Sequence, residues 1–180
     1  MHDVLEGPGG EQGGHEEAPY TMPVTVTLSI LAVLVAVTTL FGHRTSKEEL
    51  LLQSQLSDQW SFYQAKNIRM MERQIGADEL ATFTAADKEK AATLSEKYRK
   101  EAERYEKEKE EASEKAKEIE AERNLAGRRG DRYEGAEVLL EMALIICSFT
   151  MLTRNRGFWF AGSALALVGI AIAVSGYLLK

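Results

Sequence analysis

The stretch Phe158–Leu179, FWFAGSALALVGIAIAVSGYLL, decides the fold, because its 22 residues include no charged side chain. A helix rises about 1.5 Å per residue, so this run crosses a hydrocarbon core about 30 Å thick. Val138–Leu152 is apolar except for Glu141, Ser148 and Thr150 and predicts a helix over residues 133–153, with only the basic turn 154–157 between it and the first run. The sequence therefore predicts two antiparallel membrane helices joined by a tight turn.

A further apolar run covers residues 23–42 and predicts the first membrane helix. A cleaved signal peptide fits less well, because the preceding segment is acidic and the run exceeds a usual signal core. That segment, residues 1–22, is rich in Gly and Asp/Glu and has no Lys or Arg, which predicts a disordered, solvated tail. Its two histidines, His2 and His15, adjoin acidic residues and leave weak metal binding as the alternative.

The segment 43–132, between the first and second apolar runs, is mostly polar and has helical periodicity. Ser46 and Glu49 have capping-box spacing, which predicts that a helix restarts after the first span. A limb 47–75 is followed by a break from Gly76 to Ala86 and by a charged limb 87–123 with apolar residues at heptad spacing. The expected fold is an all-α integral membrane protein with three transmembrane helices and a long charged helical hairpin between the first and second. The alternative is a charged helix that lies free in solvent.

Two groups of side chains in this insert predict contacts. Trp60, Phe62 and Tyr63 form an aromatic face expected to pack on another helix, with a ligand-binding aromatic box as the alternative. Arg128, Arg129 and Arg132 lie in a glycine-broken juncture just before the second span. Basic residues at that level predict contacts with anionic lipid headgroups.

Small residues recur along the third span at steps of three and four, which places them on one seam and allows close helix packing. The seam comprises Gly162, Ala166, Gly169, Ala173 and Gly176. Two interpretations are open: packing against the other spans of the same chain, and self-association of two chains.

Glu137 and Glu141 share one face of the second span. An intramembrane carboxylate is costly and is a functional candidate by default. His43 and Arg44 end the first span on the same side of the membrane, so a structural ion pair with the carboxylates is expected. A proton or cation site at Glu141 is the alternative.

The chain resembles a family of bacterial three-span inner-membrane proteins described only as a domain of unknown function. The resemblance lies in Gly42-His43-Arg44-Thr45, in the segment 57–69 (SDQWSFYQAKNIR) and in the turn Thr153-Arg154-Asn155-Arg156. It implies a location in the bacterial inner membrane and a three-span architecture, and it implies no chemistry.

Orientation follows from basic residues near the spans. Six lie on the side of the insert (Arg44, Lys47, Arg128, Arg129, Arg132 and Lys180), against Arg154 and Arg156 on the other. The positive-inside rule thus predicts a cytoplasmic insert.

No nucleophile–base pair, phosphate loop or metal-ligand spacing stands out, the single cysteine excludes an internal disulfide, and no basic stripe indicates nucleic-acid binding. We therefore expect no cofactor and no enzymatic activity. The first functional hypothesis is a homo-oligomeric, membrane-anchored coiled-coil scaffold, or a subunit of a membrane complex. The alternative is an ion- or proton-conducting oligomer that uses Glu141.

Overall fold

The structure is a computed structural model that describes residues 21–82 and 88–179. These residues form three helices, α1 (Thr21–Thr82), α2 (Lys88–Thr153) and α3 (Arg156–Leu178), and no strand. Each helix is long and apolar enough to cross a membrane. The expected tail 1–22 lies almost entirely outside the described residues, as does the start of the limb 87–123 at Asp87.

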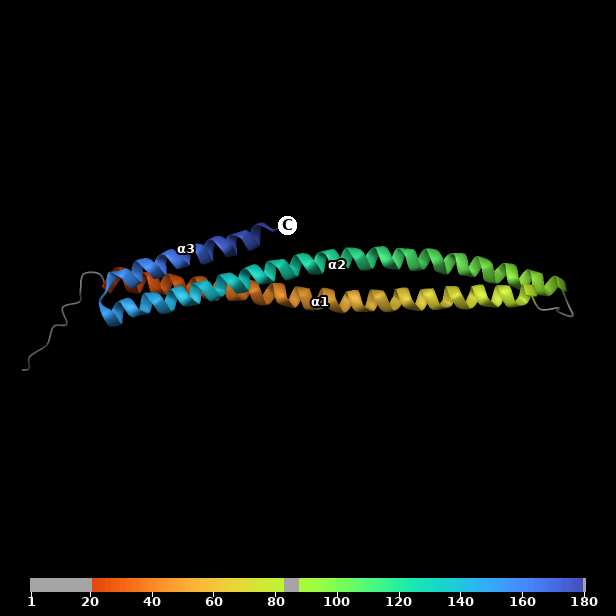
Figure 1. The fold of residues 1–180 in the computed structure, drawn as a ribbon, viewed down its shortest axis with the longest axis horizontal. Helices are drawn as coiled ribbons and strands as arrows, with labels where there is room; N and C mark the ends of the chain where they lie inside the picture. The colour runs from red at the N-terminus through yellow and green to blue at the C-terminus, as the bar shows by residue number, and fades with distance from the viewer. Residues whose placement is uncertain (1–20, 83–87, 180) are drawn as a thin grey trace, which may run out of the picture.

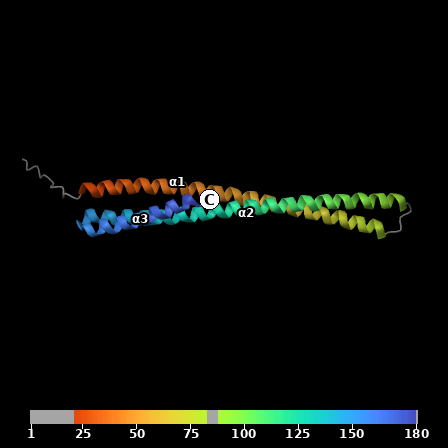
Figure 2. The same cartoon turned by 90° about the horizontal axis from the view of Figure 1, so that it is seen from above.

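The helices form one elongated rod (Figures 1 and 2). α1 and α2 run side by side in opposite directions, and α3 folds back along the end of α2 that lies beside the start of α1. The α1–α2 pair extends alone beyond α3 to the connection between Thr82 and Lys88. α2 is therefore the helix that both others contact.

The predicted helix restart at Ser46 is wrong, because α1 continues without interruption from the apolar run into the polar segment. Thr45 Oγ1 donates to the Phe41 carbonyl at 2.6 Å, and Ser46 Oγ donates to the Gly42 carbonyl at 3.0 Å. Both hydroxyls bond back to the preceding turn of the same helix, so neither acts as an N-terminal cap.

The predicted break from Gly76 to Ala86 begins too early, because α1 continues to Thr82, and the predicted break at Gly127 is wrong, because α2 is continuous there. Both glycines allow close approach instead of ending a helix. A Cβ at Gly76 would lie 3.0 Å from Tyr98 Cδ2, and one at Gly127 would lie 3.1 Å from Glu49 Oε1. The limbs and the spans are thus parts of the same two helices.

A single heptad register holds α1 and α2 together along the whole rod. The inward residues of each helix recur at alternating steps of four and three, the spacing of a left-handed coiled coil. In α1 they are Val24, Leu28, Leu31, Val35, Thr38, Gly42, Thr45, Glu49, Leu52, Leu56, Gln59, Tyr63, Lys66, Met70, Arg73, Ala77 and Leu80. In α2 they are Ala91, Ser95, Tyr98, Ala102, Tyr105, Lys109, Ala112, Ala116, Ile119, Arg123, Ala126, Gly130, Tyr133, Glu137, Leu140, Leu144 and Cys147. All of these residues are buried or half-buried, so the change from apolar to polar sequence leaves the register intact.

α3 packs on α2 through its seam of small residues. A Cβ added at Gly162 would overlap Cys147 Sγ and lie 2.9 Å from the Ala143 carbonyl oxygen. Corresponding Cβ atoms at Gly169 and Gly176 would lie 3.1 Å from Leu140 Cγ and 3.0 Å from Arg132 Cβ. Ala166 is buried and Ala173 is half-buried. The seam therefore lies against α2 of the same chain.

The turn before α3 brings all three helices together. Arg154 adopts a positive φ of 56°, and the Asn155 side chain caps α3 by accepting a hydrogen bond from the Gly157 N–H at 2.9 Å. Trp159 Nε1 then donates to Thr27 Oγ1 of α1 at 3.2 Å. The apolar core lies just beyond, formed by Leu31, Leu140, Ala143, Cys147 and Ala166.

We expect the substitutions Gly162→Ala and Gly135→Ala to change stability in opposite directions, although each adds one methyl group. At Gly162 the methyl meets backbone and sulfur atoms of α2, so overpacking should cost about 1–3 kcal/mol. At Gly135 a Cβ has no neighbour within 4 Å, and the higher helix propensity of alanine should add up to about 1 kcal/mol. Thermal unfolding of both variants in one detergent, followed by circular dichroism, measures the difference. A Gly162→Ala variant as stable as Gly135→Ala would contradict the close α2–α3 contact.

Candidate functional site

Glu137 occupies a core position of α2 and faces α1 in the apolar part of the rod. Thr39 Oγ1 lies 2.5 Å from its Oε1 and 3.0 Å from the Val35 carbonyl oxygen. A hydroxyl has one hydrogen to donate. Thr39 therefore donates to Glu137 or to Val35 at any one time, because one hydrogen cannot fully satisfy both acceptors.

Glu141 lies one turn further along α2, is exposed, and makes no hydrogen bond or salt bridge to the described residues. The expected ion pair with His43 or Arg44 is not formed, and both of those side chains are exposed. The antiparallel direction of the helices explains this. Measured from the Thr39–Glu137 contact, Arg44 lies toward the polar end of the rod and Glu141 toward the apolar end. The two residues are therefore about 13 Å apart along the axis.

Charged side chains also enter the α1–α2 core in the polar part of the rod. Lys66 Nζ forms a salt bridge with Glu108 and lies 4.8 Å from the Phe62 ring centroid and 5.4 Å from that of Tyr105. The Lys66 side chain is only 14% exposed. Its charge is thus balanced by one carboxylate and two aromatic faces.

The same arrangement recurs one heptad further from the apolar end of the rod. Arg73 Nε lies 3.0 Å from Glu101 Oε2, and the guanidinium lies 4.9 Å from the Tyr98 ring centroid. Each cation comes from α1, and each tyrosine and glutamate comes from α2. We call these two sets the cation–tyrosine–glutamate rungs. Their sequence signal is the spacing of seven between Lys66 and Arg73, between the two tyrosines and between the two glutamates.

The predicted aromatic face is divided between two environments. Trp60 and Tyr63 are half-buried and meet edge to face with ring centroids 5.4 Å apart. Phe62 is 48% exposed and contacts Lys66 instead. Only Tyr63 occupies a core position, so the three rings do not act as one packing surface.

Two of the three arginines expected at lipid headgroups contact the end of α3. Arg129 Nε donates to the Leu179 carbonyl at 2.8 Å, and Arg132 Nη1 donates to Ser175 Oγ at 3.1 Å. Positive charge at a helix C-terminus is favourable, and Arg129 also satisfies a carbonyl that has no partner within the helix. Arg128 is exposed.

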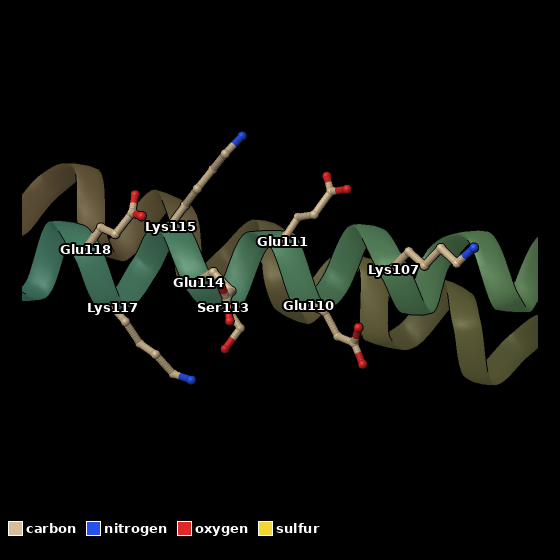
Figure 3. Close-up of a pocket in the computed structure, with 8 residues that line it drawn as sticks. All are labelled: Lys107, Glu110, Glu111, Ser113, Glu114, Lys115, Lys117 and Glu118. Carbon is tan, nitrogen blue, oxygen red and sulfur yellow. The ribbon is translucent and has the colours of Figure 1, made fainter.

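The outer surface of α2 is a dense mixture of charges, shown in Figure 3. Side chains there project away from α1 around a shallow hollow open to solvent, lined by Lys107, Glu110, Glu111, Ser113, Glu114, Lys115, Lys117 and Glu118. Within residues 21–82 and 88–179, no group of three or more His, Cys, Asp or Glu side chains is arranged to hold a metal ion.

The salt bridge at Lys66 predicts a pH dependence of stability. The hydrogen bond from Lys66, and the nearby charges of Lys66, Arg104 and Arg69, lower the pKa of Glu108 against the opposing effect of desolvation. A carboxyl whose pKa is lowered on folding stabilises the protein at pH values above its unfolded pKa, about 4.3. That stabilisation is lost as the pH falls through the folded pKa. We therefore expect Glu108→Gln to lower the unfolding temperature at pH 7, with the deficit shrinking as the pH falls below about 4.

Glu110→Gln on the exposed surface of α2 is the matched control, because Glu110 makes no salt bridge to the described residues. Thermal unfolding of both variants across this pH range provides the measurement. A deficit in Glu108→Gln that is the same at every pH would show that the carboxylate charge contributes nothing.

Comparisons with known proteins place the chain in one family and identify no further relative. Neither the curated proteins nor the solved structures contain a match. The match to the family model covers residues 21–179, that is, all three helices and both parts of the rod. The chain therefore belongs to the family described as a domain of unknown function, DUF4337.

Proposed function

We propose that this protein is a non-catalytic, membrane-anchored scaffold that holds a helical rod above a bilayer for other proteins to bind. The supporting observation is the uninterrupted heptad register, which makes the apolar end and the polar end parts of the same two helices. A rod that is rigidly continuous with its anchor suits the display of a surface at a fixed distance from the membrane.

The apolar end of the rod has the surface of a membrane domain. Large apolar side chains point outward from all three helices there, including Val33 at 63%, Ile145 at 54% and Val168 at 52% exposure. Water would oppose so large an apolar surface, whereas hydrocarbon solvates it. In this proposal the three apolar segments cross the membrane, and the rest of the α1–α2 pair forms the extramembrane hairpin.

The proposed orientation places the hairpin in the cytoplasm of a bacterial cell, with the anchor in the inner membrane. Exposed basic side chains at the base of the hairpin, Arg44, Lys47 and Arg128, support it. Arg128 then lies at the level of anionic headgroups. The mixed charges on the outer surface of α2 give partners a polar surface to recognise.

The anchor predicts two results for protein in bacterial membranes. The full chain should remain in the membrane pellet after alkaline carbonate extraction. A thiol in Lys117→Cys should react with a membrane-impermeant maleimide in inside-out vesicles but not in right-side-out vesicles. Unsubstituted protein is the control, because Cys147 is fully buried. Extraction by carbonate would refute membrane insertion, and labelling only in right-side-out vesicles would refute the orientation.

Proton or cation conduction is the second candidate function. The position of Glu137 supports it, because its carboxylate accepts a hydrogen bond from Thr39 Oγ1 inside the apolar part of the rod. The exposed carboxylate of Glu141, one turn away, would then exchange protons with a wet path.

We expect the scaffold to show no proton flux dependent on Glu141. In this proposal Glu141 carries no ion, so vesicles containing the wild type and vesicles containing Glu141→Gln should acidify at the same rate as protein-free vesicles. A pH-sensitive dye trapped in the lumen provides the measurement. Flux that disappears in Glu141→Gln while assembly is unchanged would replace the scaffold with the conducting function.

A further inference from the structure

The face of α1 that points away from α2 is unlike any other polar surface of the rod. Between residues 50 and 75 this outward stripe, taken at alternating steps of four and three, contains no charged residue. It comprises Leu50, Ser54, Ser57, Ser61, Gln64, Ile68, Met71 and Ile75, which are all exposed. Ile68, Met71 and Ile75 are 56%, 50% and 56% exposed. On α2 between Lys88 and Arg132, the only exposed large apolar side chain is Leu94. An exposed, uncharged stripe with large apolar side chains at both ends marks an interaction surface.

The stripe continues into the apolar part of α1 without changing phase. Ala36, Leu40 and His43 lead through Lys47 to Leu50 at the same steps, and all five side chains are exposed. Among residues 36–75 of the stripe, Lys47 is the only Lys, Arg, Asp or Glu. The outward stripe of α1 is therefore nearly uncharged in both the apolar part and the polar part of the rod.

Glu141 lies beside this face, on the side that α3 leaves open. α3 contacts α2 at Ala136, Leu140 and Cys147, whereas Glu141 is about 140° around the helix from Ala136. α1 lies between these two directions, as its contact with Glu137 shows. The carboxylate is exposed and would meet hydrocarbon, an environment that disfavours it unless protein covers it.

We propose that the outward stripe of α1 binds α1 of a second copy of this chain, standing parallel in the same membrane. This inference deepens the scaffold proposal and depends on its membrane anchor. A partner that covers the stripe must cross the bilayer and extend beside the rod on the same side. A second copy in the same orientation meets both requirements through a twofold axis along the rod.

Charge favours this occupant over a pairing through α2. Around a parallel twofold axis each seam residue meets its own counterpart, so a charged seam would repel itself. The stripe of α1 places serine against serine and isoleucine against isoleucine. The outward stripe of α2 includes Glu103, Glu110 and Lys117, which are spaced by seven residues. A twofold axis along it would pair each of these charges with an identical charge. The second copy also replaces lipid beside Glu141.

Disulfide cross-linking of full-length protein in native membranes tests the pairing. Ser57→Cys and Ser61→Cys place thiols on the α1 stripe, and Glu114→Cys and Lys117→Cys are controls on the α2 stripe. At the membrane level Ala36→Cys is compared with Val168→Cys on α3. After oxidation, we expect disulfide-linked homodimers for the three α1 variants, and only monomers for the controls and for the unsubstituted chain, whose Cys147 is buried.

Like charges introduced into the seam provide a second measurement. Ser61→Glu with Gln64→Glu should convert the dimer in nanodiscs to a monomer, while Ser113→Glu on α2 should not. The pairing is overturned if the α1 variants cross-link no more than the α2 controls, or if their product has the mass of a different protein. Retention in the membrane after carbonate extraction is scored in the same samples. A retained but monomeric protein refutes only the pairing, whereas an extracted protein refutes the anchor as well.

Discussion

In the proposed membrane-anchored state, one heptad register has to hold α2 against α1 both in a bilayer and in water, and the other features depend on it. Apolar attraction holds helices together in water but contributes little inside a bilayer, where packing and hydrogen bonds take over. The register satisfies both conditions by using small residues where the chain changes character. Thr38, Gly42, Ala126 and Gly130 are all buried there, which lets the backbones meet closely. α3 then uses a neighbouring face of α2 in the same way.

Beyond the apolar part, the cation–tyrosine–glutamate rungs fix the alignment of the two helices. The buried residues of α2 there are mainly small, such as Ala112 and Ala116, and alanines alone would tolerate sliding by a heptad. A slide of one heptad would move one of the two cations, Lys66 or Arg73, onto the tyrosine and glutamate of the other rung and leave the remaining cation without either, and an unpaired charge in a half-buried site is costly. The polar core thus provides specificity more than stability, a role attested for buried polar residues in coiled coils.

Much of the helix content follows from the sequence, because long apolar runs and heptad spacing are strong periodic signals. The errors came from local signals. Ser46 resembles a cap, but its hydroxyl bonds back to its own helix, and Gly76 resembles a break, but it lies inside α1 and accommodates Tyr98 of α2. The expected ion pair is absent because two residues predicted on the same side of a membrane can still lie at different levels along two antiparallel helices. Arg129 was misplaced because no sequence pattern reveals that α3 ends beside it.

With its apolar end anchored in a membrane as proposed, the protein is a lever, because α1 and α2 are continuous from anchor to tip. A helix of 62 residues is about 93 Å long, and only about 30 Å of it fits within hydrocarbon. Membrane helices change tilt to match bilayer thickness. With no hinge between anchor and tip, a tilt of about 10° displaces the far end sideways by about 10 Å. The tip therefore amplifies a change in the lipid around the anchor, and a partner bound there would experience membrane thickness as mechanical displacement.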